Sequence, residues 1–203
     1  MTKPSNKFLL LGLLMTAIIA TWAAAHPMQT GNTAALSGPA ASAQKKLDAL
    51  QQNADSADPR PLVTTLSEVE INAYLNSSAV KLPVGVHSAH LVGSEGTLNG
   101  AARVNFDEIR AGRGSANPLL ALFSGTHDVN VQAHGSGAGG RGNVDVDSVE
   151  IDGTAVPRFA LEYFVDHYLK PKYPGIGMHS TFALPDRIDS ATIGRHQLTL
   201  VQK

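Results

Sequence analysis

The chain has 203 residues, of which 43% are hydrophobic, and its formal net charge at pH 7 is −1. This balance provides no concentrated basic face for neutralising phosphates, and it excludes nucleic acid as a partner. The chain contains no cysteine, which excludes disulfide bridges, thiolate metal sites and a lipidated cysteine. Its stability must therefore come from burial, and no cofactor is expected.

The first 25 residues have the three-part layout of a secretory signal peptide. Two lysines precede an uncharged apolar run, and Ala23 and Ala25 occupy the −3 and −1 positions of a cleavage site before His26. The alternative is an uncleaved inner-membrane anchor through residues 8–25, since 18 uncharged residues approach the length of a spanning helix. In either case we expect the rest of the chain in the periplasm or outside the cell.

Residues 26–60 are predicted to be a disordered leader, because they include few large apolar side chains to offset the entropy of ordering. Leu47 and Leu50 alone give only a weak apolar stripe for a helix in this segment. The folded domain is predicted over residues 62–203. Its first element is a helix that begins at Ser67, because Glu70 three positions later completes a capping box.

Two strands are then expected over residues 84–92 and 97–107, joined by a hairpin connection at residues 93–96. A short apolar helix at residues 118–124 follows, framed by Asn117, Pro118 and Gly125.

A second hairpin has a glycine-rich connection over residues 135–142. Its hydrophobic alternation slips at Ser148, which predicts a bulge or sharp bend near Asp147.

The segment from Val156 to about Leu169 is predicted to be the main helix, with apolar residues around almost its whole circumference. Such a helix is expected against a concave sheet rather than on an outer surface. Further strands are expected at Phe182 and Leu184 and over residues 191–201. The predicted fold class is α+β, with a curved antiparallel sheet of about six strands packed on or around this one long apolar helix.

No pattern in the sequence indicates catalysis or metal binding. Gly135, Gly137 and Gly140 have the spacing of a dinucleotide fingerprint, but a strand rather than a helix follows them. The eight histidines include no HExxH pattern, and no Gly-x-Ser-x-Gly elbow occurs. We therefore expect a protein that is not an enzyme and has no catalytic residue and no metal ligand, although a triad assembled only in space, as in a hydrolase, has no signature in sequence.

The order of elements resembles that of the tubular lipid-binding (TULIP-like) superfamily, in particular its small bacterial extracytoplasmic members. The residues that carry the resemblance are the opening segment 66–75, Pro83, the strand pairs, the apolar helix at residues 156–169 and the closing strands. The resemblance covers residues 62–203 and implies a helix inside a curved sheet with an apolar groove between them. The predicted groove residues are Val104, Phe106, Leu119, Leu122, Phe123, Phe159, Tyr163 and Phe164.

The function expected from these features is non-enzymatic binding or carriage of a lipid or another apolar molecule. Arg103, Arg110 and Arg113 precede the apolar segment at residues 118–124 and are predicted to face lipid headgroups at a membrane surface. The alternative is an extracytoplasmic scaffold or protein-interaction module with a solid core and no ligand. The sequence does not indicate a protein partner for either function.

Overall fold

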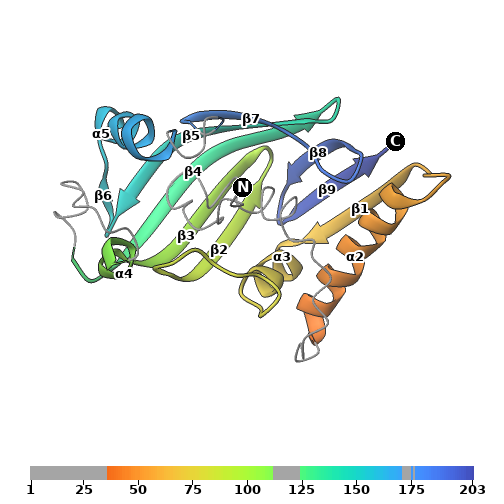
Figure 1. Cartoon of the computed structure of the whole chain (residues 1–203), viewed down its shortest axis with the longest axis horizontal. Coiled ribbons are helices and arrows are strands. Elements are labelled where there is room, and N and C mark those ends of the chain that lie inside the picture. Colours follow the sequence, from red (N-terminus) through yellow and green to blue (C-terminus); the bar gives the residue numbers. More distant parts are fainter. Residues whose placement is uncertain (1–35, 112–123, 171–174, 176) are drawn as a thin grey trace, which may run out of the picture.

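The computed structural model describes residues 36–111, 124–170, 175 and 177–203, and only the backbone of Arg110, Tyr168 and Leu169. Within these residues it is an α+β structure in which nine antiparallel strands form one sheet (Figure 1). The elements in chain order are α2 (Gly38–Asp55), β1 (Leu62–Ser67), α3 (Glu68–Leu75), β2 (Val86–Ser94), β3 (Thr97–Asn105), α4 (Phe106–Ala111), β4 (Thr126–Ala138), β5 (Arg141–Ile151), β6 (Thr154–Ala155), α5 (Arg158–Phe164), a π-helical turn η2 (Val165–Leu169), β7 (His179–Ala183), β8 (Ile188–Gly194) and β9 (Gln197–Gln202).

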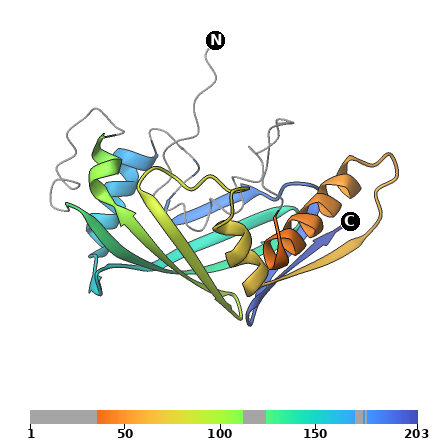
Figure 2. The same ribbon diagram turned by 90° about the horizontal axis from the view of Figure 1, so that it is seen from below.

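The sheet consists of two groups of strands that meet at β4. The order β1-β9-β8-β4-β3-β2 forms one path, and β5 joins β4 to β6 and β7. The contact between β4 and β8 is a single register pair, Gly137 with Ala191. Backbone hydrogen bonds from Gly96 to Ile193 (2.8 Å) and from His196 to Gly93 (2.9 Å) also connect the tips of the β2–β3 and β8–β9 hairpins. Figure 2 shows these two tips meeting at the lowest point of the bent sheet.

The helices gather at two ends of the sheet. α2 and α3 lie beside β1, β8 and β9, whereas α4 and α5 lie at the other end, near β4 and β6 (Figure 1). Buried side chains on β2 to β5 alternate with exposed ones, as expected of a sheet with one wet face. No helix within the described ranges is both long and apolar enough to cross a membrane.

Two local predictions are confirmed. Ser67 is the N-cap of α3, and its side chain and that of Glu70 exchange the two hydrogen bonds of a capping box. The register between β4 and β5 shifts so that Gln132 pairs with Ser148 and Ala133 with Val146, which leaves Asp147 as the bulged residue. The bulge keeps Val146 on the buried face together with the two later apolar residues Val149 and Ile151.

The predicted disorder of residues 26–60 is wrong for α2, which spans 18 of them. Its sequence is rich in good helix formers, and Pro39 lies in the first turn, where a missing N–H does no harm. The apolar stripe is narrow, but Ala40, Ala43 and Leu50 bring the helix into close contact with the sheet, and all three are buried. Small side chains that look uninformative in sequence here permit close packing.

The remaining differences concern how the sheet is completed. The sheet is not strongly curled around a helix, and it has nine strands rather than about six. The sequence does not predict β1. This strand pairs with β9, which lies far away in the sequence, so no local pattern reveals it. The strand predicted over residues 191–201 is a hairpin, in which His196 adopts a positive φ of 55° in place of the usual turn residues.

The late helix forms, as α5 followed by η2, but its surroundings differ from the prediction. Leu161, Phe164 and Val165 are buried, whereas Phe159 is 75% exposed and Tyr163 is 45% exposed. The helix follows the short strand β6 at one end of the sheet, so only one of its faces contacts the core. It is an outer element with one buried face, and the longest helix is α2.

Candidate functional site

Two apolar cavities lie on the face of the sheet that carries α2 and α3. The first, the α2 cavity, measures about 110 Å³, and its lining includes Ala43, Leu47, Leu66, Tyr74, Ile188 and Leu200. The second, the glycine cavity, measures about 90 Å³, and its lining includes Leu91, Gly93, Gly135, Gly142, Phe182 and Ile193. Ile71, Leu184, Ala191 and Leu198 line both. Because they share these four residues, the two cavities are neighbours along one apolar surface.

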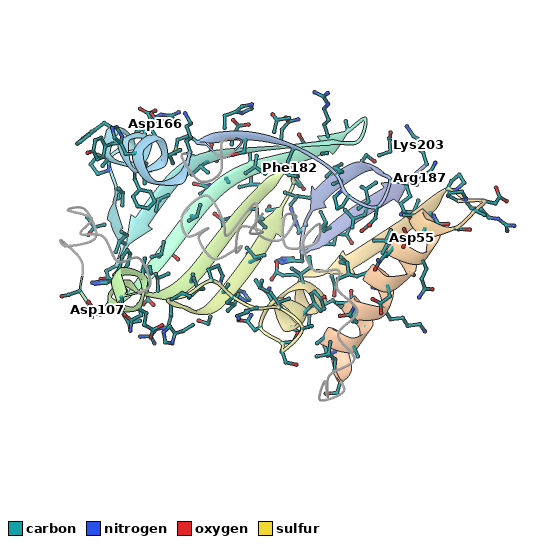
Figure 3. The ribbon with its side chains drawn as sticks, in the orientation of Figure 1. Asp55, Asp107, Asp166, Phe182, Arg187 and Lys203 are labelled. Carbon is teal, nitrogen blue, oxygen red and sulfur yellow. The ribbon has the colours of Figure 1, made fainter. Side chains whose placement is uncertain are left out.

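Glycines in the strands form part of the wall of the glycine cavity and permit close packing beside it. A Cβ atom on Gly142 would lie 2.4 Å from the ring of Phe182, and one on Gly137 would lie 2.9 Å from the Cβ of Ala191. β7 and β8 therefore approach β4 and β5 more closely than side chains would allow. Figure 3 shows Phe182 near the point where the chain passes from β7 towards β8.

The sequence prediction placed these glycines in a flexible connection over residues 135–142. In the structure, only Gly139 and Gly140 form the turn, with φ values of 59° and 74°, and the strands continue through the others. The signal that could have revealed the site is the period-two spacing of Gly135 and Gly137, which continues the alternation of β4. Glycines on the buried side of a strand indicate that another element approaches closely.

A hydrogen-bonded carboxylate holds α2 over its cavity. Glu70 is 9% exposed, and its oxygens accept hydrogen bonds from Ser42 Oγ (2.5 Å), Lys46 Nζ (2.8 Å) and the Ser67 backbone N–H (2.8 Å). Burial alone would raise the pKa of Glu70, but the hydrogen bonds from Lys46, Ser42 and Ser67 outweigh it and lower the pKa to about 2. α2 is thereby attached to α3 at the edge of the α2 cavity.

Replacing Glu70 by glutamine should flatten the acid limb of the stability curve. A carboxyl group whose folded pKa of about 2 lies below the ordinary 4.5 stabilises the fold above pH 4.5, and this contribution is lost as the pH falls toward 2. At neutral pH we expect E70Q to lower the free energy of unfolding by roughly 2–3 kcal/mol. Urea unfolding at several pH values measures the difference.

The exposed Glu162, which pairs with Arg158 on α5, supplies the matched control. The variant E162Q should change the free energy of unfolding by no more than about 0.5 kcal/mol. Equal pH dependence for E70Q and the unchanged protein would show that the Glu70 contacts do not stabilise the fold.

In the structure, the predicted groove residues that are described do not all lie together. Val104 and Phe106, the first residue of α4, are packed in the main core cluster, and Phe164 is buried on α5. Phe159 and Tyr163 are exposed on α5, and none of these five lines either apolar cavity. The other predicted residues, Leu119, Leu122 and Phe123, lie outside the described part of the chain.

The predicted headgroup residues are also placed only in part. Arg103 is exposed on the wet face and lies 3.6 Å from Asp128. Arg110 belongs to α4, but its side chain is outside what the structure describes, as is the whole of Arg113. The structure therefore does not bring the three arginines together as a set.

The wet face of the sheet carries an open hollow of about 300 Å³, whose lining includes the polar residues His90, Asn130 and Glu150. These residues alternate along their strands with core positions, which is the ordinary pattern of a solvated sheet face. Across the described ranges, no three His, Asp or Glu side chains lie close enough together to bind a metal ion. The apolar cavities are the stronger candidate, because apolar walls around unfilled space have no other evident role.

Comparisons of the chain with protein-family models, with curated proteins and with solved structures found no match. The candidate site is therefore argued from its own geometry.

Proposed function

We propose that this protein is exported and binds, without catalysis, a lipid chain or another apolar group on the surface formed by the α2 cavity and the glycine cavity. The observation that carries the proposal is that these two apolar cavities adjoin through four shared residues. Ligand sites are typically concave, mostly apolar and supplied with few polar groups. The groove that the resemblance implied lay near α5, whereas the proposed groove lies between α2, α3 and β8.

The volumes suit part of an acyl chain or a small ring. An apolar cavity of roughly 150 Å³ binds benzene, so each cavity alone is smaller than that limit and the two together exceed it. An unfilled apolar cavity costs about 24 cal/mol per Å³, or roughly 2–3 kcal/mol for each of these. A ligand that fills them recovers van der Waals contacts that the empty protein lacks.

A second candidate function is an extracytoplasmic protein-interaction module, and one observation favours it. Phe159 is 75% exposed on α5, and exposed aromatic side chains are enriched at protein interfaces. An exposed aromatic side chain also suits contact with a membrane surface, and the three arginines predicted to face headgroups would then bind lipid phosphates. The cavities distinguish the candidates, because an interaction module does not need them.

Enlarging Ala191 should weaken binding, because this residue lines both cavities. We expect A191L to fill the shared wall and reduce the affinity for the neutral dye N-phenyl-1-naphthylamine by about tenfold or more. Dye fluorescence measures the affinity, and thermal unfolding shows whether the variant is folded. Mass spectrometry of lipids extracted from protein purified from its native host identifies the natural ligand.

A matched control is Ala183 on β7, which is exposed and lines neither cavity. The variant A183L adds the same side chain and should bind the dye as the unchanged protein does. No saturable dye binding by the unchanged protein, together with no co-purified lipid, would contradict the proposal and favour the interaction module.

A further inference from the structure

Within the described part of the chain, Glu68 is the one charged residue in the lining of the two apolar cavities. It is the first residue of α3, and its side chain is only 20% exposed. Its Oε2 atom accepts hydrogen bonds from the Gly93 backbone N–H (3.3 Å) and from His196 Nδ1 (2.8 Å). Since Gly93 lines the glycine cavity, these contacts place the carboxylate at the cavity wall.

The other carboxylate oxygen of Glu68, Oε1, has no hydrogen-bond donor among the residues that the structure describes. An ionised carboxylate offers about four acceptor sites. When it is largely removed from water, leaving these sites without hydrogen-bond donors costs free energy. A ligand group that carries N–H or O–H can donate a hydrogen bond to Oε1.

The charges around Glu68 give the site a negative character. Of the residues that the structure describes, no lysine or arginine lines either cavity. Arg195, one residue before His196, is 74% exposed and pairs with Glu95 at 3.6 Å. His196 itself is 64% exposed and is the cation-forming group beside the carboxylate. Among the described residues, the imidazole of His196 is the one basic side chain in contact with Glu68.

From this placement we propose that the glycine cavity selects amphipathic ligands whose polar end is a cation or a neutral hydrogen-bond donor, and that Glu68 recognises this end. The inference rests on the proposed function and adds the class of ligand to it. The apolar tail lies along the shared surface toward the α2 cavity. An anionic head, such as the carboxylate of a fatty acid, is disfavoured because like charges close together in a partly buried site repel.

The experiment compares three ligands that share one tail: decylamine, 1-decanol and decanoate. Each displaces N-phenyl-1-naphthylamine from the full chain at about pH 8, where alkylammonium groups are charged and fatty-acid carboxyl groups are ionised. All ligands are kept below their aggregation limits, and the ionic strength is low. We expect decylamine to bind at least about tenfold more tightly than decanoate, with 1-decanol between them, and the preference to shrink as salt is added.

Two variants assign the preference to its residue. E68Q keeps the size of the side chain and an acceptor for the Gly93 N–H, and it should reduce the preference for decylamine over decanoate to about threefold or less. E95Q removes the same charge from a side chain that is 77% exposed at the neighbouring hairpin tip. It should leave the preference unchanged, because exposed charges are screened.

The outcomes separate this inference from the function on which it rests. If the dye binds and all three ligands displace it equally, or decanoate displaces it best, the role of Glu68 is wrong while the apolar site stands. If E95Q removes the preference as fully as E68Q does, the preference comes from net charge and the assignment to Glu68 is wrong. If neither the dye nor any ligand binds, the proposed function fails and this inference fails with it.

Discussion

Replacing Leu50 by alanine should lower the free energy of unfolding by about 3 kcal/mol and release α2 from the sheet. The Leu50 side chain is completely buried and belongs to a core cluster with Leu66, Ile188 and Leu200. These neighbours lie on strands from both ends of the chain, so the cavity left by a smaller side chain cannot close by moving α2 alone. Chemical denaturation followed by circular dichroism measures the loss.

The same helix offers a control and a second readout. Gln52 is exposed on α2, and Q52A should leave stability within about 0.5 kcal/mol of the unchanged protein. In L50A, limited proteolysis should cut within residues 38–55 sooner than in Q52A, because a released helix of this length is only marginally stable. If L50A and Q52A behave alike, α2 does not dock through Leu50.

Replacing Asn72 by leucine should cost about 2–4 kcal/mol, because it leaves two buried backbone groups without partners. The side chain donates from Nδ2 to the Leu91 carbonyl and accepts from the Leu91 N–H at Oδ1, both at 2.8 Å. Asn76, one helical turn later, makes the same pair of bonds to Ala89. α3 thereby covers the edge of β2 as a neighbouring strand would.

The Asn72 prediction has two comparisons. N72D retains the acceptor for the Leu91 N–H but loses the donor, and it should fall between N72L and the unchanged protein in urea unfolding. Asn99 lies exposed on β3, so N99L makes the same chemical change where little stability is expected to be lost. An uncovered strand edge also pairs readily with other chains, so sedimentation should detect association of N72L. Equal stability of N72L and N99L would contradict the role of Asn72.

The features of this fold that the sequence predicts best are those that depend on residues close together in the chain. The capping box at Ser67 and the bulge at Asp147 depend on residues within a few positions of each other, and both predictions are confirmed. β1 depends on a partner strand more than a hundred residues away, whose register no local pattern reveals. The docking of α2 likewise depends on a sheet surface that forms only after the chain ends meet.

The candidate site is less predictable than the fold, for a related reason. Large apolar residues such as Phe159 and Phe106 attract attention in a sequence, yet the first is exposed and the second is packed in the core. The cavity walls include small residues beside the large apolar ones, and a residue such as Ala191 matters because Gly137 on another strand packs against it. Glu68 reads as an ordinary first-turn acid of a helix until the β8–β9 hairpin places His196 beside it.

The eight residues of α3 and its two caps carry several tasks at once. Glu68, Asn72 and Asn76 bond to alternate residues of β2, Glu70 binds the preceding helix, and Ile71 contributes to both cavities. Few positions in this segment can be substituted without breaking one of these contacts. A distant relative should therefore be recognisable by this spacing of acids and asparagines ahead of an edge strand, even where the rest of the two chains no longer aligns.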